Sequence, residues 1–135
     1  MAVVVGYVPT KEGRAALRRA SEESLLRRTK LIVINSSRGG KDYDGEEAQR
    51  FEAELVTVKG QLDEGGVEYE VRELVRGKEP AEDLIEVANK VNADFIVIGL
   101  RRRNPVGKLI LGSNAQRILL DASCAVLAVK AGADD

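Results

Sequence analysis

The chain alternates short apolar runs with longer amphipathic stretches, and this alternation restricts the fold more than any other feature of the sequence. The apolar runs are rich in valine and isoleucine, which is typical of strands covered on both faces of a sheet. They span residues 2–7, 31–35, 67–74, 95–98 and 125–130. Since a helical stretch separates each strand from the next, we predict an α/β, Rossmann-like fold. Its sheet is open, mainly parallel and five-stranded, with helices on both faces and right-handed crossovers.

The stretches between the strands carry apolar side chains at three- and four-residue steps, which indicates helices with one buried stripe. We expect the stripes to comprise Ala16, Leu17, Ala20 and Leu25; Ala48, Phe51, Leu55, Val58 and Leu62; Leu84, Ile85, Ala88 and Val91; and Ala115, Ile118, Leu119 and Ala122. Thr10 and Ser113 are suitable N-caps, and Ser113 with Gln116 fits a capping box. Gly65 and Gly66 suit the end of the long helix.

Composition excludes several classes of function. The 135 residues contain no histidine, which removes the usual general base and the usual metal ligand, and we expect no metal site. Cys124 is the single cysteine, and its place at the start of an apolar run favours a buried, inert thiol. A net charge of −1 and 4% aromatic residues give no basis for binding nucleic acid. Since we find neither a membrane-length apolar run nor a signal peptide, we expect one cytoplasmic domain spanning residues 1–135.

The stretch after the fourth predicted strand has the pattern of an anion-binding turn. Residues 99–113 contain spaced glycines and lead into a helix, whose first amides and positive dipole end suit an anion. A dense basic cluster lies in the same stretch, formed by Arg101, Arg102, Arg103 and Lys108. This cluster is either an electropositive mouth for an anion or a solvated loop, and both interpretations stay open. A P-loop is excluded, because Leu109 follows Gly107-Lys108 and offers no hydroxyl to a metal.

The spacing in this stretch resembles the nucleotide motif of the universal stress protein family, which reads Gly, two residues, Gly, nine residues, Gly, then Ser or Thr. The chain has Gly99, then Arg102 at the place of the second glycine, and Gly112-Ser113 after nine further residues. The tail is also similar to the family, with a helix at 114–122, then Cys124 and a final strand at 125–130. Residues 77–80, which precede a helix that leads into 93–99, are similar too. The resemblance covers nearly the whole chain. It implies an adenine-nucleotide alpha-hydrolase-like fold, a role in the stress response, and ATP with magnesium as the bound cofactor.

Two positions depart from the nucleotide-binding members of that family. Val8 stands where those members usually carry aspartate near the ribose and adenine, and valine accepts no hydrogen bond. Arg102 carries a side chain where glycine would let the backbone approach a phosphate closely. Its guanidinium either fills the pocket or pairs with phosphate oxygens, and the sequence alone does not decide between the two.

Three segments follow the carboxyl ends of predicted strands and should converge where the strand order reverses, namely residues 7–13, 35–45 and 99–113. The residues that we expect at the nucleotide are Tyr7, Val8, Pro9, Thr10, Asn35, Gly99, Arg101, Arg102, Arg103, Gly107, Lys108, Gly112, Ser113 and Asn114. Carboxylates are few in these segments, so we expect a protein that is not an enzyme. Three hypotheses follow: a nucleotide-responsive regulatory protein, a dimeric interaction module without a ligand, and a slow ATPase.

The strands at the two ends of the predicted sheet differ in character. Residues 67–74 alternate apolar with charged side chains, so we expect that strand at an edge. The last strand is apolar on both faces and would leave an open apolar edge in a monomer. The family resemblance implies that this last strand pairs across a two-fold axis in a homodimer. Whether the chain also has a different protein partner stays open. The expected contact residues are Ala125, Val126, Leu127, Ala128, Val129 and Lys130.

Overall fold

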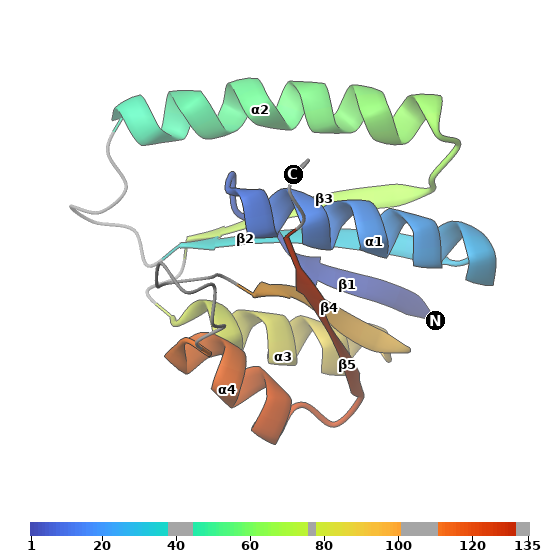
Figure 1. The fold of residues 1–135 in the computed structure, drawn as a ribbon, viewed down its shortest axis with the longest axis vertical. Coiled ribbons are helices and arrows are strands. Elements are labelled where there is room, and N and C mark those ends of the chain that lie inside the picture. The colour runs from blue at the N-terminus through green and yellow to red at the C-terminus, as the bar shows by residue number, and fades with distance from the viewer. Residues whose placement is uncertain (38–44, 76–77, 101–110, 132–135) are drawn as a thin grey trace.

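A computed structural model describes residues 1–37, 45–75, 78–100 and 111–131, and strands alternate with helices along these residues (Figure 1). The strands are β1 (Ala2–Gly6), β2 (Lys30–Ser37), β3 (Tyr69–Val75), β4 (Phe95–Leu100) and β5 (Ala125–Lys130). The helices are α1 (Lys11–Arg27), α2 (Gly45–Glu64), α3 (Pro80–Val91) and α4 (Ser113–Asp121). All five predicted strands are present, and their ends shift by at most two residues from the predicted bounds.

The five strands form one sheet in the order β3-β2-β1-β4-β5, and every pair within it is parallel. The predicted mainly parallel sheet is therefore confirmed, as is the edge position of β3. In the centre, Val4 of β1 lies between Ile32 of β2 and Ile96 of β4. The chain adds strands on one side of β1 and then crosses to the other side. The order therefore reverses between β1 and β4, the place where ligands of such sheets bind.

Helices cover both faces of the sheet, with α1 and α2 on one face and α3 and α4 on the other (Figure 1). Because side chains alternate along a strand, neighbouring residues of β1 enter different cores. Val3 and Val5 pack with α1 and α2, whereas Val4 packs with α3 and α4, and all three are fully buried. A sheet buried on both faces explains why its strands read as continuous apolar runs.

Most helix ends follow the predicted signals, and one does not. Thr10 is the N-cap of α1, and its hydroxyl accepts a hydrogen bond from the Gly13 amide. Gly66, at φ +71°, follows the end of α2 as expected. The capping box at α4 is wrong, because Gly112 is the N-cap and makes no side-chain cap. Gln116 instead donates its side-chain amide to the Leu111 carbonyl oxygen at 3.1 Å.

The predicted buried stripes are confirmed in their centres and wrong at some ends. Leu25 is 48% exposed, because Ser24, four residues after Ala20, takes the buried position at the end of α1. Leu119 of α4 is also exposed, and Val87 of α3 is a core residue that the stripe did not include. The side chain of Ala48 lies outside the described residues.

The structure bears on three features that composition raised: the single cysteine, membrane-spanning helices and metal-binding groups. Cys124 is a free thiol, but it is only half-buried, against the core that α3 and α4 cover. Burial raises the pKa of this thiol, which disfavours the reactive thiolate. Among the described helices, none is long and apolar enough to cross a membrane. The described residues also contain no group of three or more side chains that would hold a metal ion.

Candidate functional site

A cavity of about 230 Å³ lies at the point where the strand order reverses. It opens at the carboxyl ends of β1, β2 and β4 and is bounded by the first turns of α3 and α4. Its described lining consists of Gly6, Tyr7, Val8, Ile34, Ser36, Pro80, Leu84, Ile98, Gly99, Asn114, Ala115 and Ile118. Most of these side chains are apolar, and a few polar groups converge among them. That combination is typical of a small-molecule site.

Two glycines beside the cavity are required by the packing of α1. A Cβ atom at Gly99 would lie 2.2 Å from the carbonyl oxygen of Glu12, in the first turn of α1. A Cβ atom at Gly13 would lie 1.8 Å from the carbonyl oxygen of Val8. Both contacts are with backbone and leave no room for a side chain. Gly99, the first glycine of the motif, therefore has a structural role whether or not a ligand binds.

The first turns of α3 and α4 are joined beside the cavity by Asn114. Its Oδ1 atom accepts a hydrogen bond from the Ala81 amide at 3.1 Å. Helix α3 has Pro80 in its first turn, and its own N-cap, Glu79, makes no side-chain cap. Asn114 thus satisfies one of the amides that the start of α3 leaves open. Its side-chain NH₂ group can act only as a donor.

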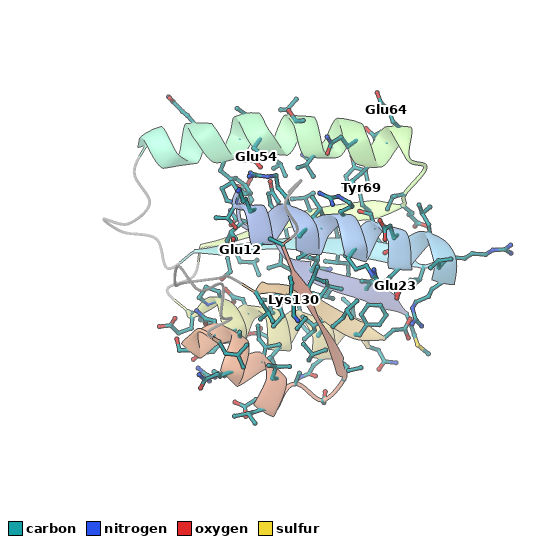
Figure 2. All side chains as sticks on the ribbon, in the orientation of Figure 1. Glu12, Glu23, Glu54, Glu64, Tyr69 and Lys130 are labelled. Atoms are coloured by element: carbon teal, nitrogen blue, oxygen red, sulfur yellow. The ribbon has the colours of Figure 1, made fainter. Side chains whose placement is uncertain are left out.

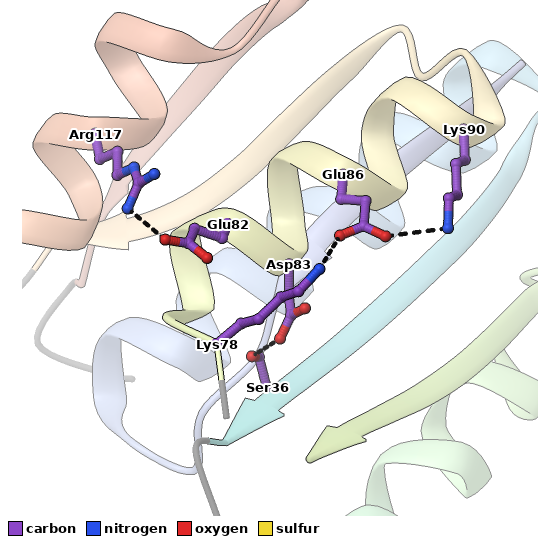
Figure 3. Close-up of polar contacts among 7 residues, drawn as sticks. All are labelled: Ser36, Lys78, Glu82, Asp83, Glu86, Lys90 and Arg117. Carbon is purple, nitrogen blue, oxygen red and sulfur yellow. Dashed lines mark hydrogen bonds and ion pairs between the residues drawn. The ribbon is translucent and has the colours of Figure 1, made fainter. Parts of the chain in front are cut away.

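A buried carboxylate lies behind the polar part of the cavity wall. Asp83 of α3 is fully buried, and the hydroxyl of Ser36 donates a hydrogen bond to its Oδ2 atom (Figure 3). Asp83 belongs to the first turns of α3, where the helix dipole favours a negative charge. The pair joins the end of β2 to the start of α3. It thereby holds together two elements that line the cavity.

Several ion pairs lie near the Ser36–Asp83 hydrogen bond, on the outer face of α3 (Figure 3). Glu86 accepts hydrogen bonds from Lys78 at 2.7 Å and from Lys90 at 3.0 Å. These bonds lower the pKa of Glu86 to about 2. Arg117 of α4 pairs with Glu82 of α3 at 2.9 Å and so ties the two helices together. These charged side chains on the outer face of α3 are thus paired with one another.

Comparison with known proteins agrees with this geometry. The model of the universal stress protein family matches residues 1–130. The chain belongs to the universal stress protein family. A universal stress protein of Mycolicibacterium smegmatis is 43% identical over 128 residues, which cover 95% of this chain and 96% of that protein.

Two solved members of the family from Archaeoglobus fulgidus are also similar over almost their whole length. One universal stress protein structure has a TM-score of 0.83 and 37% identity, covering 96% of this chain and 98% of that one. Another, in complex with dAMP, has a TM-score of 0.78 and 32% identity, with coverage of 96% and 98%. The binding of dAMP is an observation on that relative.

The residues expected at a nucleotide are divided by the structure into three groups. Tyr7, Val8, Gly99 and Asn114 line the cavity. Pro9 and Thr10 at the start of α1, Asn35 in β2, and Gly112 and Ser113 at the start of α4 are described but do not belong to the lining. Arg101, Arg102, Arg103, Gly107 and Lys108 lie outside the described residues. The alternative roles of Arg102 therefore stay predictions.

Tyr7 contributes to the cavity without offering its hydroxyl to it. Its ring is packed in the core beneath α1 and α2, and its hydroxyl donates to Glu54 of α2 at 2.6 Å. Burial and the bond to Glu54 raise the pKa of Tyr7 well above its usual range. Arg14 of α1 pairs with the same carboxylate at 3.2 Å. These three residues join the end of β1 to α1 and α2 on the face away from α3, where Glu54 lies between the two helices (Figure 2).

Sequence reasoning missed the residues that helix α3 brings to the site. Pro80 and Leu84 line the cavity, and Asp83 lies directly behind it. Asp83 was not among the residues expected at the site. A usable signal was present, because Asp83 adjoins Leu84 on the buried stripe, where a carboxylate needs a partner. Nothing in the sequence identified that partner as Ser36.

A larger hollow of about 400 Å³ lies between α1 and α2. Apolar residues such as Leu17, Val58 and Leu62 form part of its wall, and the Arg14–Glu54 pair lies at its rim. No helix N-terminus and no part of the 99–113 stretch belongs to its described lining. We therefore take the smaller cavity at the strand ends as the candidate site.

Proposed function

We propose that the chain binds an adenine nucleotide, ATP or a related one, in the cavity between β1, β4, α3 and α4. Bound nucleotide would then regulate its part in the stress response. The observation that carries the proposal is the coincidence of three features. The cavity lies at the switch point of the sheet, its wall is mostly apolar, and helix α4 begins beside it. The dAMP complex of a relative that is 32% identical supports the same class of ligand.

The lining suits the two chemically different parts of a nucleotide. Ile34, Leu84 and Ile98 offer an apolar surface to a flat base. The first amides of α4, which follow Gly112, offer donors and the positive end of a dipole to phosphate oxygens. A Cβ atom at Gly112 would meet nothing within 4 Å, so this turn has open space beside it. If magnesium accompanies ATP, its ligands would be chiefly phosphate oxygens and water.

Equilibrium binding of labelled ATP and AMP, each with and without magnesium, tests the proposal. We expect saturable binding that weakens at least tenfold in Ala115→Leu, since the added carbons enter the cavity. Ala53→Leu, at an exposed alanine of α2, adds the same bulk elsewhere and should bind as the parent does. Absence of saturable binding up to millimolar nucleotide would refute the proposal and favour the ligand-free interaction module.

We also propose that the chain regulates rather than catalyses. Phosphoryl transfer needs positioned metal ions and a group that orients the nucleophile. The described residues offer no cluster of three metal ligands, and Asp83 is bonded to Ser36. A phosphate-release assay separates the slow ATPase from this proposal. Release that falls in both Arg102→Ala and Ser113→Ala would support the ATPase, whereas release unchanged in both would indicate contamination.

A homodimer through β5 is the second proposal, and the sheet edge favours it. Within the described residues β5 pairs only with β4, and its valines and leucine are half-buried. A second copy would complete the hydrogen bonds of this edge and cover its apolar side chains. Ala128 is exposed in the single chain, so Ala128→Arg should leave the monomer folded and separate the dimer. Sedimentation of the parent as a monomer at micromolar concentration would refute the dimer.

A further inference from the structure

We propose that Ser36 acts in the cavity as a hydrogen-bond acceptor and thereby selects a 6-aminopurine over a 6-oxopurine. The inference rests on the proposed nucleotide function and adds the residue that would choose the base. Ser36 can act in this way because the proton of its hydroxyl is already donated to buried Asp83.

Strand geometry places the Ser36 side chain on the face of the cavity. Residues two apart along a strand point to the same face, and Ile34 points into the core beneath α3 and α4. Ser36 therefore points to that face too, and both residues line the cavity. The bond to Asp83 agrees with this direction, because Asp83 belongs to α3 (Figure 3).

The partner of Ser36 determines the direction of the hydrogen bond. A carboxylate has no proton and can only accept, so the proton between the two oxygens belongs to Ser36. Asp83 is 0% exposed, and a buried carboxylate is costly unless hydrogen bonds satisfy it. Rotating the hydroxyl toward a ligand would remove one of those bonds. The Ser36 oxygen consequently meets a ligand with its lone pairs.

The other polar side chains in the described lining are held by other partners. The Tyr7 hydroxyl is bonded to Glu54 on the opposite face of the sheet. The Oδ1 atom of Asn114 is held on the Ala81 amide at the start of α3, and the NH₂ group of Asn114 only donates. Ser36 is thus the side-chain acceptor that the described wall offers to a ligand.

This polarity distinguishes two common purines. Adenine carries an amino group at position 6, which donates to the Ser36 oxygen. A 6-oxopurine places an acceptor there, so two acceptors would face each other and both would lose a partner on burial. Since a hydrogen-bond mismatch of this kind is costly, we expect AMP to bind about 10- to 100-fold more tightly than IMP.

Calorimetric dissociation constants for AMP and IMP, measured side by side, test the inference. In Ser36→Ala the AMP preference should fall to less than about threefold, because the acceptor is gone. In Asp83→Asn the AMP preference should also fall. An amide both donates and accepts, so the Ser36 hydroxyl is no longer required to donate its proton to residue 83. Ser36→Thr, which keeps a hydroxyl, should retain the preference even if its methyl group weakens both ligands.

Controls separate selectivity from damage to the fold. Ser21→Ala removes a hydroxyl that bonds to the Leu17 carbonyl within α1, far from Ser36 in the fold, and should leave the AMP-to-IMP ratio unchanged. Thermal unfolding of each variant shows whether it is folded. The ratio is read only from folded variants.

The outcomes distinguish this inference from the proposed function. Equal binding of AMP and IMP to the parent chain, or a preference that survives in Ser36→Ala, would overturn the role of Ser36 and leave nucleotide binding intact. Binding of neither nucleotide would overturn both. A preference for AMP that disappears in Ser36→Ala and persists in Ser36→Thr and Ser21→Ala would support the inference.

Discussion

Replacing Gly99 with alanine tests how closely α1 approaches the end of β4. The new Cβ atom would lie 2.2 Å from the Glu12 carbonyl oxygen and 2.6 Å from its carbonyl carbon. Comfortable separations between such atoms are about 3.5 Å. The first turn of α1 would therefore have to move by about 1 Å. The same turn is also in close backbone contact at Gly13 and Val8, which leaves little room for this movement.

The cost follows from the nature of the clashing atoms. Overpacking usually costs about 1–3 kcal/mol, and this case belongs at the upper end because backbone, not a flexible side chain, must move. Unfolding entropy near the melting temperature is about 2.1 cal/mol/K per residue. For 135 residues, a loss of about 3 kcal/mol lowers Tm by about 10 °C.

Urea unfolding of Gly99→Ala and Gly60→Ala, with thermal melting in parallel, provides the comparison. Gly60 lies within α2, and a Cβ atom there would meet nothing within 4 Å. Its replacement should stabilise the chain by about 0.5–1 kcal/mol, because glycine is unfavourable inside a helix. The two alanines thus have opposite expected signs. If Gly99→Ala unfolds within about 0.5 kcal/mol of the parent, the close approach of α1 to β4 is refuted.

Three further predictions concern single contacts. Tyr7→Phe, which removes the hydroxyl bonded to Glu54, should lower the free energy of unfolding by about 1 kcal/mol in urea titrations; an unchanged midpoint would contradict the bond. Asn114→Ala should cost about 1 kcal/mol by uncapping α3 at Ala81, whereas Asn114→Asp keeps the acceptor and should cost less. Because two lysines lower the pKa of Glu86 from 4.5 to about 2, its ionised form stabilises the fold above pH 4.5, and this contribution is lost as pH falls toward 2. Melting temperatures across that range should therefore fall less steeply for Glu86→Gln than for the parent, and parallel curves would argue against the pairing.

Periodicity was enough to predict the architecture of this chain. Runs such as 95–98 are apolar on both faces, which requires a sheet covered on both sides, and alternation with helical stretches requires parallel strands. The charges within 67–74 also predicted correctly that this strand lies at an edge. These inferences succeed because burial imposes a repeat of two on strands and of three to four on helices. The chain itself carries that repeat.

The helix ends show where local signals were insufficient. Ser113 and Gln116 match a capping box, yet the N-cap of α4 is Gly112, one residue before the cap that the pattern requires. Leu25 continues an apolar stripe but is 48% exposed, because the direction of α1 against the sheet buries Ser24 instead. Each signal was compatible with two placements one residue apart. Packing against the rest of the fold selected one of them.

For the candidate site, the sequence by itself predicted a region. Glycines, a strand end and a helix start between positions 99 and 113 predicted where a ligand would approach. Only the tertiary structure decided which groups meet there: it brings Asp83 to Ser36 across 47 positions of chain, and it turns the Tyr7 hydroxyl away toward Glu54. The physical reason is that a hydrogen bond depends on distance and direction in space. A local pattern records neither for residues on different elements.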